Sequence, residues 1–191
     1  FSPTFPFIAI DAEGGRVNRL KPAYGFIDVA SHQTLGEADD LEGTKNASLM
    51  LAKELSELGF NVNFAPVVDV NTYPQNPVIG TLGRSFSSDA EDVARHAKVF
   101  IEGQHAYGIA TAIKHFPGHG SAHADSHKGF VDVTETYQPV ELVPYAQLIK
   151  EGLADMVMTA HIVNKKIDPR YPATLSDAYI EKILREQLGF Q

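Results

Sequence analysis

The chain has 191 residues, a formal net charge of −8 and no cysteine. Its length is enough for one domain with a sizeable core, and the missing cysteines exclude disulfide frameworks, zinc–thiolate sites and thiol nucleophiles. No block of Lys and Arg suggests nucleic acid as a partner, and no apolar run is long enough to span a membrane bilayer. The compartment, cytoplasmic or secreted, and the oligomeric state stay open.

Apolar runs and helical patterns alternate along the chain in four successive units. Near-continuous apolar runs, typical of strands buried on both faces, lie near residues 7–10, 62–69, 110–115 and 155–160. Helix-period patterns follow them at about residues 42–58, 90–107, 139–151 and 176–188. Four such units predict a parallel sheet with helices packed outside it.

Polar or ionisable residues follow the end of every predicted strand. They are Asp11 with Glu13, Asp69, Lys114 with His115, and His161. In a (β/α)8 barrel all these ends meet at one face, where active sites lie, whereas a doubly wound open sheet concentrates function at one switch point. The pattern therefore favours an α/β fold that is a fragment of a TIM-type barrel, since four units are too few to close one. Asp69 by itself fits a strand cap as well as a functional residue.

The segment from Lys114 to Lys128 is the richest in chemistry, with four of the eight histidines. Its proline and glycines exclude a continuous helix, so it is predicted to be a loop that leaves a strand. The histidines suggest a metal site, but the broken backbone removes helical spacing, and tight HxH or HExxH patterns are absent. In the alternative, Asp125 orients His127 and raises its pKa, which suits proton transfer near neutral pH. We expect little apolar packing over residues 116–130, and hence a loop that is mobile without ligand.

Two further segments are candidates for ligand binding. Asp11 ends the first apolar run and is followed by a Gly-Gly pair, which permits a tight turn close to a ligand. Arg16 and Arg19 add donor forks for hydroxyl, carbonyl or carboxylate groups, and Arg84 follows a glycine-bearing loop. GxGxxG, P-loop and GxSxG patterns are absent, so nucleotide binding and serine hydrolase chemistry have little support.

Together these segments resemble glycoside hydrolase family 3, in the family's order and nearly end to end. The motifs that carry the resemblance are Asp11-Ala-Glu-Gly-Gly-Arg-Val, Asn63-Phe-Ala-Pro-Val-Val-Asp-Val, Gly83-Arg-Ser-Phe and Lys114-His-Phe-Pro-Gly-His-Gly. Asp125-Ser126-His127 resembles the β-N-acetylglucosaminidase branch, in which a loop His-Asp dyad replaces a carboxylic acid/base.

The resemblance implies a role for each matching residue. His127 would be the acid/base and Asp125 its partner. The sugar would be held by Asp11, Arg19, Arg84, Lys114 and His115. The implied reaction is retaining, exo-acting hydrolysis of terminal β-linked N-acetylhexosamine, so the expected partner is an N-acetylglucosamine-containing glycan derived from peptidoglycan or chitin. No metal or organic cofactor is needed for this chemistry.

The sequence departs from the family pattern in several places. Residues 188–191 resemble the segment just before the nucleophile-bearing strand, and the family's first barrel strand has no counterpart. We therefore expect residues 1–191 to be a partial barrel domain without its nucleophile, inactive when alone. Ala12 stands where Gln or His is common in the branch, and the loop before Arg84 is slightly longer, which affects fine substrate preference.

Other functions stay open at this point. A β-glucosidase or xylosidase of the same family would use the same pocket. So would a phosphorylase, because a histidine acid/base adds no negative charge beside incoming phosphate. Two alternatives of another class are a metal-dependent barrel hydrolase and a non-catalytic sugar-binding protein.

Overall fold

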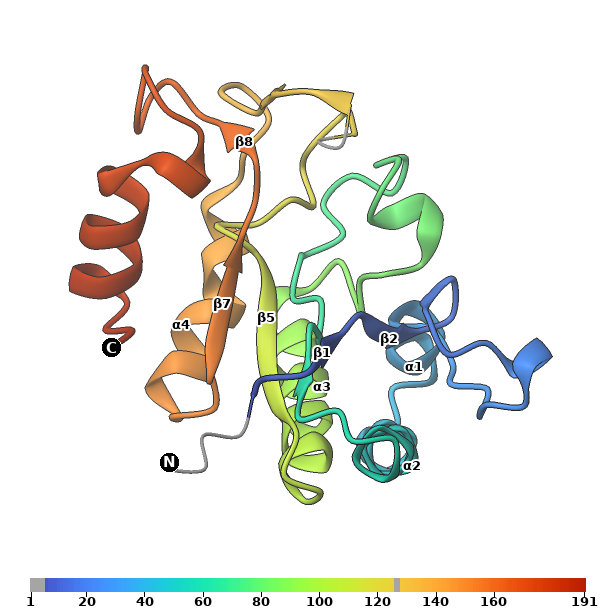
Figure 1. Cartoon of the computed structure of the whole chain (residues 1–191). Helices are drawn as coiled ribbons and strands as arrows, with labels where there is room; N and C mark the ends of the chain where they lie inside the picture. Colours follow the sequence, from blue (N-terminus) through green and yellow to red (C-terminus); the bar gives the residue numbers. More distant parts are fainter. Residues whose placement is uncertain (1–5, 126–127) are drawn as a thin grey trace.

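The computed structural model describes residues 6–125 and 128–191. At its centre lies a four-stranded sheet in the order β1-β4-β5-β7 (Figure 1), in which every neighbouring pair is parallel. The four strands are β1 (Ala9–Ile10), β4 (Val62–Asn63), β5 (Ala110–Phe116) and β7 (Met156–Thr159). Each coincides with one of the predicted apolar runs, so the predicted parallel sheet is confirmed.

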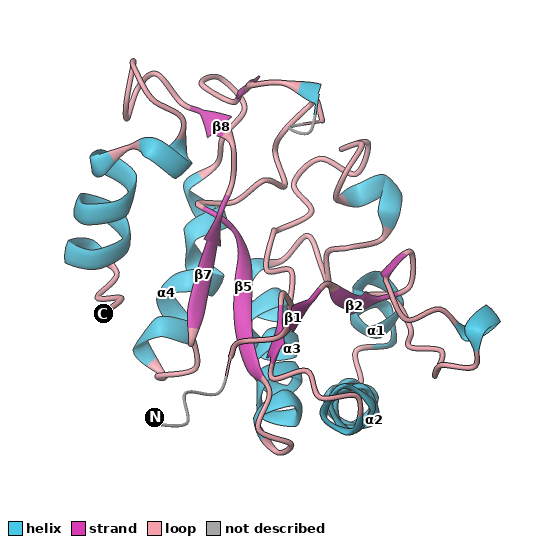
Figure 2. Ribbon diagram, viewed as in Figure 1, coloured by secondary structure: helices cyan, strands magenta, loops and turns pink. Residues whose placement is uncertain are grey.

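Helices follow the strands, as their amphipathic patterns predict (Figure 2). The long ones are α2 (Leu41–Glu57), α3 (Ala90–His105) and α4 (Val143–Lys150), the last preceded by a 3-10 turn at Pro139–Leu142. The helix near the C-terminus, Ala178–Gln187, has π-type geometry. Helix α1 (His32–Ala38) is the one helix of this α type that the sequence pattern did not predict among the described residues.

The strand order distinguishes a barrel wall from a doubly wound sheet. The strands lie side by side in the order in which they occur in the chain, whereas a doubly wound sheet reverses its order at the switch point. Helix α2 packs on α3, and α3 packs on α4, so the outer helices follow the same order. Within the described residues β1 and β7 are the two edges of this sheet, so the barrel is not closed.

Two short pairs of strands lie beyond the carboxyl ends of the main sheet. β2 (Ala12–Gly14) and β3 (Val17–Asn18) form an antiparallel hairpin, and β6 (Val131–Asp132) pairs in parallel with β8 (Ile162–Val163). In Figure 1 the arrows of β5 and β7 point toward the end where β8 and the long loops lie. The loops that leave the strands are therefore gathered at one end of the sheet.

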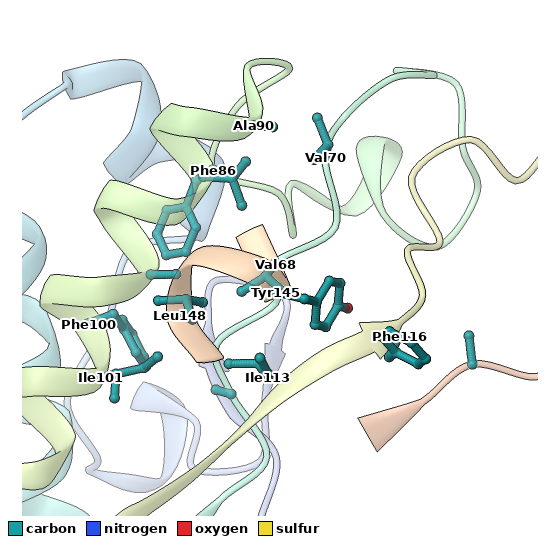
Figure 3. Packing of buried hydrophobic residues seen from close by; sticks show 14 of the residues in the cluster. Val68, Val70, Phe86, Ala90, Phe100, Ile101, Ile113, Phe116, Tyr145 and Leu148 are labelled. Atoms are coloured by element: carbon teal, nitrogen blue, oxygen red, sulfur yellow. The ribbon is translucent and has the colours of Figure 1, made fainter. Parts of the chain in front are cut away.

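The core lies between the sheet and its helices (Figure 3). Ile113 and Phe116 of β5, Phe100 of α3 and Tyr145 of α4 are fully buried there. The rings of Phe116 and Tyr145 meet edge to face, with their centroids 5.3 Å apart. Each large apolar side chain that is fully buried contributes roughly 1.5–3 kcal/mol, so this packing holds β5 and α4 together. None of the helices within the described ranges has the length and apolar character needed to cross a membrane.

Candidate functional site

A pocket of about 700 Å³ opens at the carboxyl ends of the strands. Every described residue of the predicted site lines it: Asp11, Arg19, Arg84, Lys114, His115 and Asp125. His161 lies on the pocket wall as well, and Asp69 contacts His115. The prediction that the polar strand ends share one face is therefore confirmed. His127, the predicted acid/base, lies outside the described residues.

Glu13 is the centre of a buried ion cluster under the pocket. Arg84 binds it through two hydrogen bonds, from Nε to Oε2 at 2.8 Å and from Nη2 to Oε1 at 2.7 Å. Lys114 Nζ lies 2.6 Å from Glu13 Oε1 and 2.9 Å from Asp11 Oδ1. The side chains of Glu13 and Lys114 are only 2% and 1% exposed, so the cluster is shielded from water.

The contacts within the cluster keep Glu13 and Arg84 charged. Burial by itself raises the pKa of Glu13, but the hydrogen bonds from Arg84 and the charges of Lys114 and Arg84 outweigh it and lower the pKa to about 2. Burial lowers the pKa of Arg84, and Glu13 more than reverses this shift. The Asp11 side chain keeps 35% of its surface exposed. Asp11 is therefore a carboxylate of this cluster with an accessible face for a ligand hydroxyl.

A buried polar network holds the backbone between Asp11 and Glu13. The amide of Asn63 accepts from Ala12 N at 3.1 Å and donates to Ala12 O at 2.9 Å. It also donates to Gln104 Oε1 at 3.2 Å, and Gln104 in turn donates to Ser48 of helix α2. Strand β4 and helices α2 and α3 thus fix the position of the backbone that carries the carboxylates of Asp11 and Glu13.

Asp69 orients His115. Its side chain is fully buried, and Oδ2 lies 2.7 Å from His115 Nδ1, while Oδ1 accepts from the backbone N–H groups of His115 and His119. Burial raises the pKa of Asp69, but the charge and hydrogen bond of His115 outweigh this and lower it. Arg84 Nη2 lies 3.3 Å from His115 Nε2, so the imidazole ring is held between the Asp69 carboxylate and the Arg84 guanidinium. Asp69 is therefore in direct contact with a predicted site residue and is more than a strand cap.

The loop after β5 differs from the prediction of little packing. Residues 116–122 are nearly all buried, whereas the described residues 123–124 and 128–130 are exposed. The prediction is thus wrong for the first half of the loop. It considered only apolar area, but polar side chains of Asp69, Asn76 and Glu141 hold this backbone by hydrogen bonds.

Three residues that support the site from beneath carry no local sequence signal of that role. Glu13 follows a predicted strand end, Asn76 begins the loop before Arg84, and Glu141 lies at the start of the helix predicted near residue 139. Glu141 stands three residues after Gln138 at a helix start, and the two form a reciprocal capping box, a local pattern that predicts a cap but not a contact with another loop. Among the residues described, no three His, Asp or Glu side chains converge as metal ligands do.

Comparison with known proteins identifies the family. The model of the glycosyl hydrolase family 3 N-terminal domain matches residues 3–191. The chain belongs to this family. A solved β-N-acetylglucosaminidase of glycoside hydrolase family 3 from a Paenibacillus species superposes with a TM-score of 0.89 at 41% identity, over 96% of this chain and 35% of that one. The four parallel strands and outer helices are therefore part of the family's TIM-barrel-like domain.

Two further relatives of this family 3 domain show how much of a longer protein it represents. Beta-hexosaminidase A of Pseudoalteromonas piscicida is 40% identical over 97% of the chain and 33% of its own length. NagZ from Neisseria gonorrhoeae, solved in complex with N-trifluoroacetyl-D-glucosamine, has a TM-score of 0.86 at 34% identity, over 96% of this chain and 55% of that one. The chain thus spans about a third to a half of these relatives.

Proposed function

We propose that the whole protein is a retaining, exo-acting β-N-acetylhexosaminidase that releases terminal β-linked N-acetylglucosamine from glycans. The observation that carries the proposal is the convergence of Asp11, Arg19, Arg84, Lys114 and His115 on one pocket beside Asp125. These are the residues that the family resemblance assigns to sugar binding. The names of the relatives, β-hexosaminidase and β-N-acetylglucosaminidase, support the same activity.

The pocket chemistry suits a sugar. Its volume of about 700 Å³ lies within the usual range for small-molecule sites, roughly 300–1,000 Å³. Asp11 offers an acceptor, and Lys114 and Arg84 offer donors whose two charges Glu13 and Asp11 together balance. Because sugar hydroxyls both donate and accept, this mixture of fixed partners can bind a pair of neighbouring hydroxyls without attracting a competing anion.

The proposed reaction has two steps. His127, oriented by Asp125, donates a proton to the glycosidic oxygen as a carboxylate from the rest of the protein attacks the anomeric carbon. The bond to the leaving group breaks, and a covalent glycosyl-enzyme forms. Neutral His127 then takes a proton from water, whose oxygen attacks the same carbon and releases the carboxylate. This scheme assigns no step to Asp11, which serves only to bind the sugar.

A substrate panel tests the activity. The full-length protein should cleave 4-nitrophenyl N-acetyl-β-D-glucosaminide with a kcat/KM at least tenfold above that for the matching β-glucoside and β-xyloside, a difference of about 1.4 kcal/mol in transition-state binding. The measurement is initial rates of nitrophenol release. A preference for glucoside or xyloside would assign the other branch, and release of a sugar 1-phosphate when inorganic phosphate is added would indicate a phosphorylase. Loss of activity in a chelator, restored by metal, would favour the metal hydrolase.

The 191-residue chain expressed alone should not turn over a fluorogenic N-acetylglucosaminide. Retaining cleavage needs a nucleophile opposite the acid, and Glu13 and Asp69 are held in ion pairs with Lys114, Arg84 and His115. The assay compares the isolated chain with the full-length protein. Turnover by the chain that disappears in Asp11→Asn would show that Asp11 is the nucleophile and that the proposed scheme is wrong.

A further inference from the structure

The backbone turn at residues 118–122 is held by side chains from three distant segments. Asp69 accepts from His119 N at 2.7 Å. The Asn76 amide donates to the carbonyls of His119 and Gly120, at 2.6 and 3.2 Å. Glu141 accepts from two further amides of the same turn. The side chains of Asp69, Asn76 and Glu141 are fully buried, so the turn is fixed by polar contacts that water does not weaken.

Glu141 makes the contacts that come from the outer helix layer. It stands in the 3-10 turn Pro139–Leu142 that begins helix α4. Its Oε2 accepts from Gly120 N at 2.8 Å and from Ser121 N at 3.3 Å, and its Oε1 accepts from Gln138 N at 3.3 Å. One carboxylate thus ties the start of α4 to the loop that leaves β5.

The turn at residues 118–122 packs tightly against Glu141 and the segment after β4. Gly118 has φ +123°, and a Cβ at this position would lie 2.5 Å from the Cβ of Glu141. A Cβ at Gly120 would collide with the carbonyl oxygen of Val70, which lies beyond β4. The turn is therefore clamped between Glu141 on one side and the segment after β4 on the other.

The clamped turn leads directly into the predicted acid/base segment. His119, within the turn, lines the pocket, and its backbone N–H binds the same Asp69 that orients His115. Asp125 follows Ser121 by four residues and also lines the pocket. A displacement at the turn would therefore be passed to Asp125.

We propose that Glu141 is a positioning residue that sets the place of Asp125, the predicted partner of the acid/base, by holding the backbone amides of Gly120 and Ser121. The inference rests on the proposed function, in which Asp125 and His127 deliver a proton to the leaving group. Glu141 touches neither the pocket nor the sugar. Its effect falls on the step that needs a proton, because a misplacement of about 1 Å can slow a reaction by roughly 100-fold.

The charge of Glu141 is part of the anchor. Three of its hydrogen bonds come from backbone N–H donors, so the ionised form matches them and the protonated form turns its own donor toward one of these donors. Burial, and then the charge of Asp69, raise the pKa of Glu141 to about 7. The buried hydroxyls of Tyr137 and Tyr145 lie within electrostatic range of this carboxylate. The anchor should therefore weaken as the pH falls through about 7.

The test compares two leaving groups on full-length variants. Glu141→Ala should lower kcat/KM, which reports the glycosylation step, by about 100-fold for an N-acetylglucosaminide with a poorly leaving alkyl aglycone. It should lower kcat/KM for the 2,4-dinitrophenyl glycoside by less than about threefold, because this leaving group needs no proton. The ratio of the two rates on one preparation is independent of how much protein is folded. Glu135→Ala is the matched control, since Glu135 lies on the same segment with its side chain 80% exposed, and it should leave the ratio unchanged.

Glu141→Gln separates anchoring from titration. The amide keeps one oxygen for Gly120 N and Ser121 N but turns its own N–H donors toward Gln138 N, much as the protonated acid does. It should therefore restore the ratio lost in Glu141→Ala to about the value that the wild type shows at pH 6. Gln cannot ionise. The ratio of the two rates should therefore fall less between pH 8 and pH 6 in this variant than it does in the wild type. Equal losses on both substrates in Glu141→Ala, or no rescue by Gln, would overturn the inference and leave Glu141 as a structural residue.

The variant His127→Ala distinguishes a failure of the proposed function from a failure of the inference about Glu141. His127→Ala could slow the alkyl glycoside much more than the dinitrophenyl glycoside while Glu141→Ala slows both equally. In that case the proposed function stands and the inference about Glu141 is wrong. If His127→Ala slows both substrates equally, the acid role itself is wrong, and the inference falls with it.

Discussion

Glu13→Ala should lower the free energy of unfolding of the full-length protein by about 3–5 kcal/mol at pH 7, because breaking a buried pair leaves an uncompensated charge. The side chains of Lys114 and Arg84 are only 1% and 10% exposed. Without Glu13, their remaining carboxylate partners would be Asp11 and the more distant Asp69. The measurement is urea denaturation followed by circular dichroism. Sugar binding should weaken as well, since both cations lose the partner that orients them.

A surface ion pair provides the control for Glu13. Glu151 pairs with Lys98 with both side chains 44% exposed, and exposed pairs contribute about 0–1 kcal/mol, so Glu151→Ala should have a small effect. The pH dependence gives a second check. The pKa of Glu13 is lowered from 4.5 to about 2, so its stabilising contribution is fully present above about pH 4.5 and is lost as the pH falls through about 2. A Glu13→Ala effect below about 1 kcal/mol at pH 7 would contradict a central role for this carboxylate.

On the proposed function, His127→Ala should lower kcat/KM of the full-length protein by roughly 10²–10⁴-fold on substrates whose leaving group must be protonated. The effect should be least on activated aryl glycosides, which leave without a proton. Initial rates over a series of aryl glycosides of decreasing leaving-group pKa measure it. Equal damage across the series would argue against an acid role for His127.

Asp125→Ala should repeat the His127 effect in a weaker form. Without the carboxylate, the imidazole loses the charge that orients it and favours its protonated form. Because the general acid must be protonated, the alkaline limb of the kcat/KM–pH profile should move to lower pH. Asp125 lines the pocket, which places it within reach of such a role. An unchanged pH profile in Asp125→Ala would mean that the histidine acts without this partner.

The main elements of the fold could be predicted because local patterns carry them. Strands buried on both faces need continuous apolar runs, and the four runs mark β1, β4, β5 and β7. Helix α1 escaped prediction because its seven residues include Gly36, a poor helix former. Only the packed structure explains that glycine, since a Cβ there would collide with the carbonyl oxygen of Phe86.

The packing of the loop after β5 shows the limit of pattern analysis. Its glycines and small polar residues predict little burial, yet residues 116–122 are almost entirely buried. The contacts responsible join His119 to Asp69, and Gly120 to Glu141, across 50 and 21 residues. No local spacing signals such a contact, because the partners meet only after β4, β5 and α4 have packed.

The sequence by itself determined which residues form strands and helices, that polar groups stand at the strand ends, and that the motifs belong to a glycosidase family. Those properties depend on residues within a few positions of one another. The tertiary structure decided the pairing: Glu13 is joined to Arg84 across 71 residues and Asp11 to Lys114 across 103. Strand order and register select such pairs, because they bring distant carboxylates and cations to the carboxyl ends of the strands. Burial then requires each charge to be paired, since an unpaired buried charge is unstable.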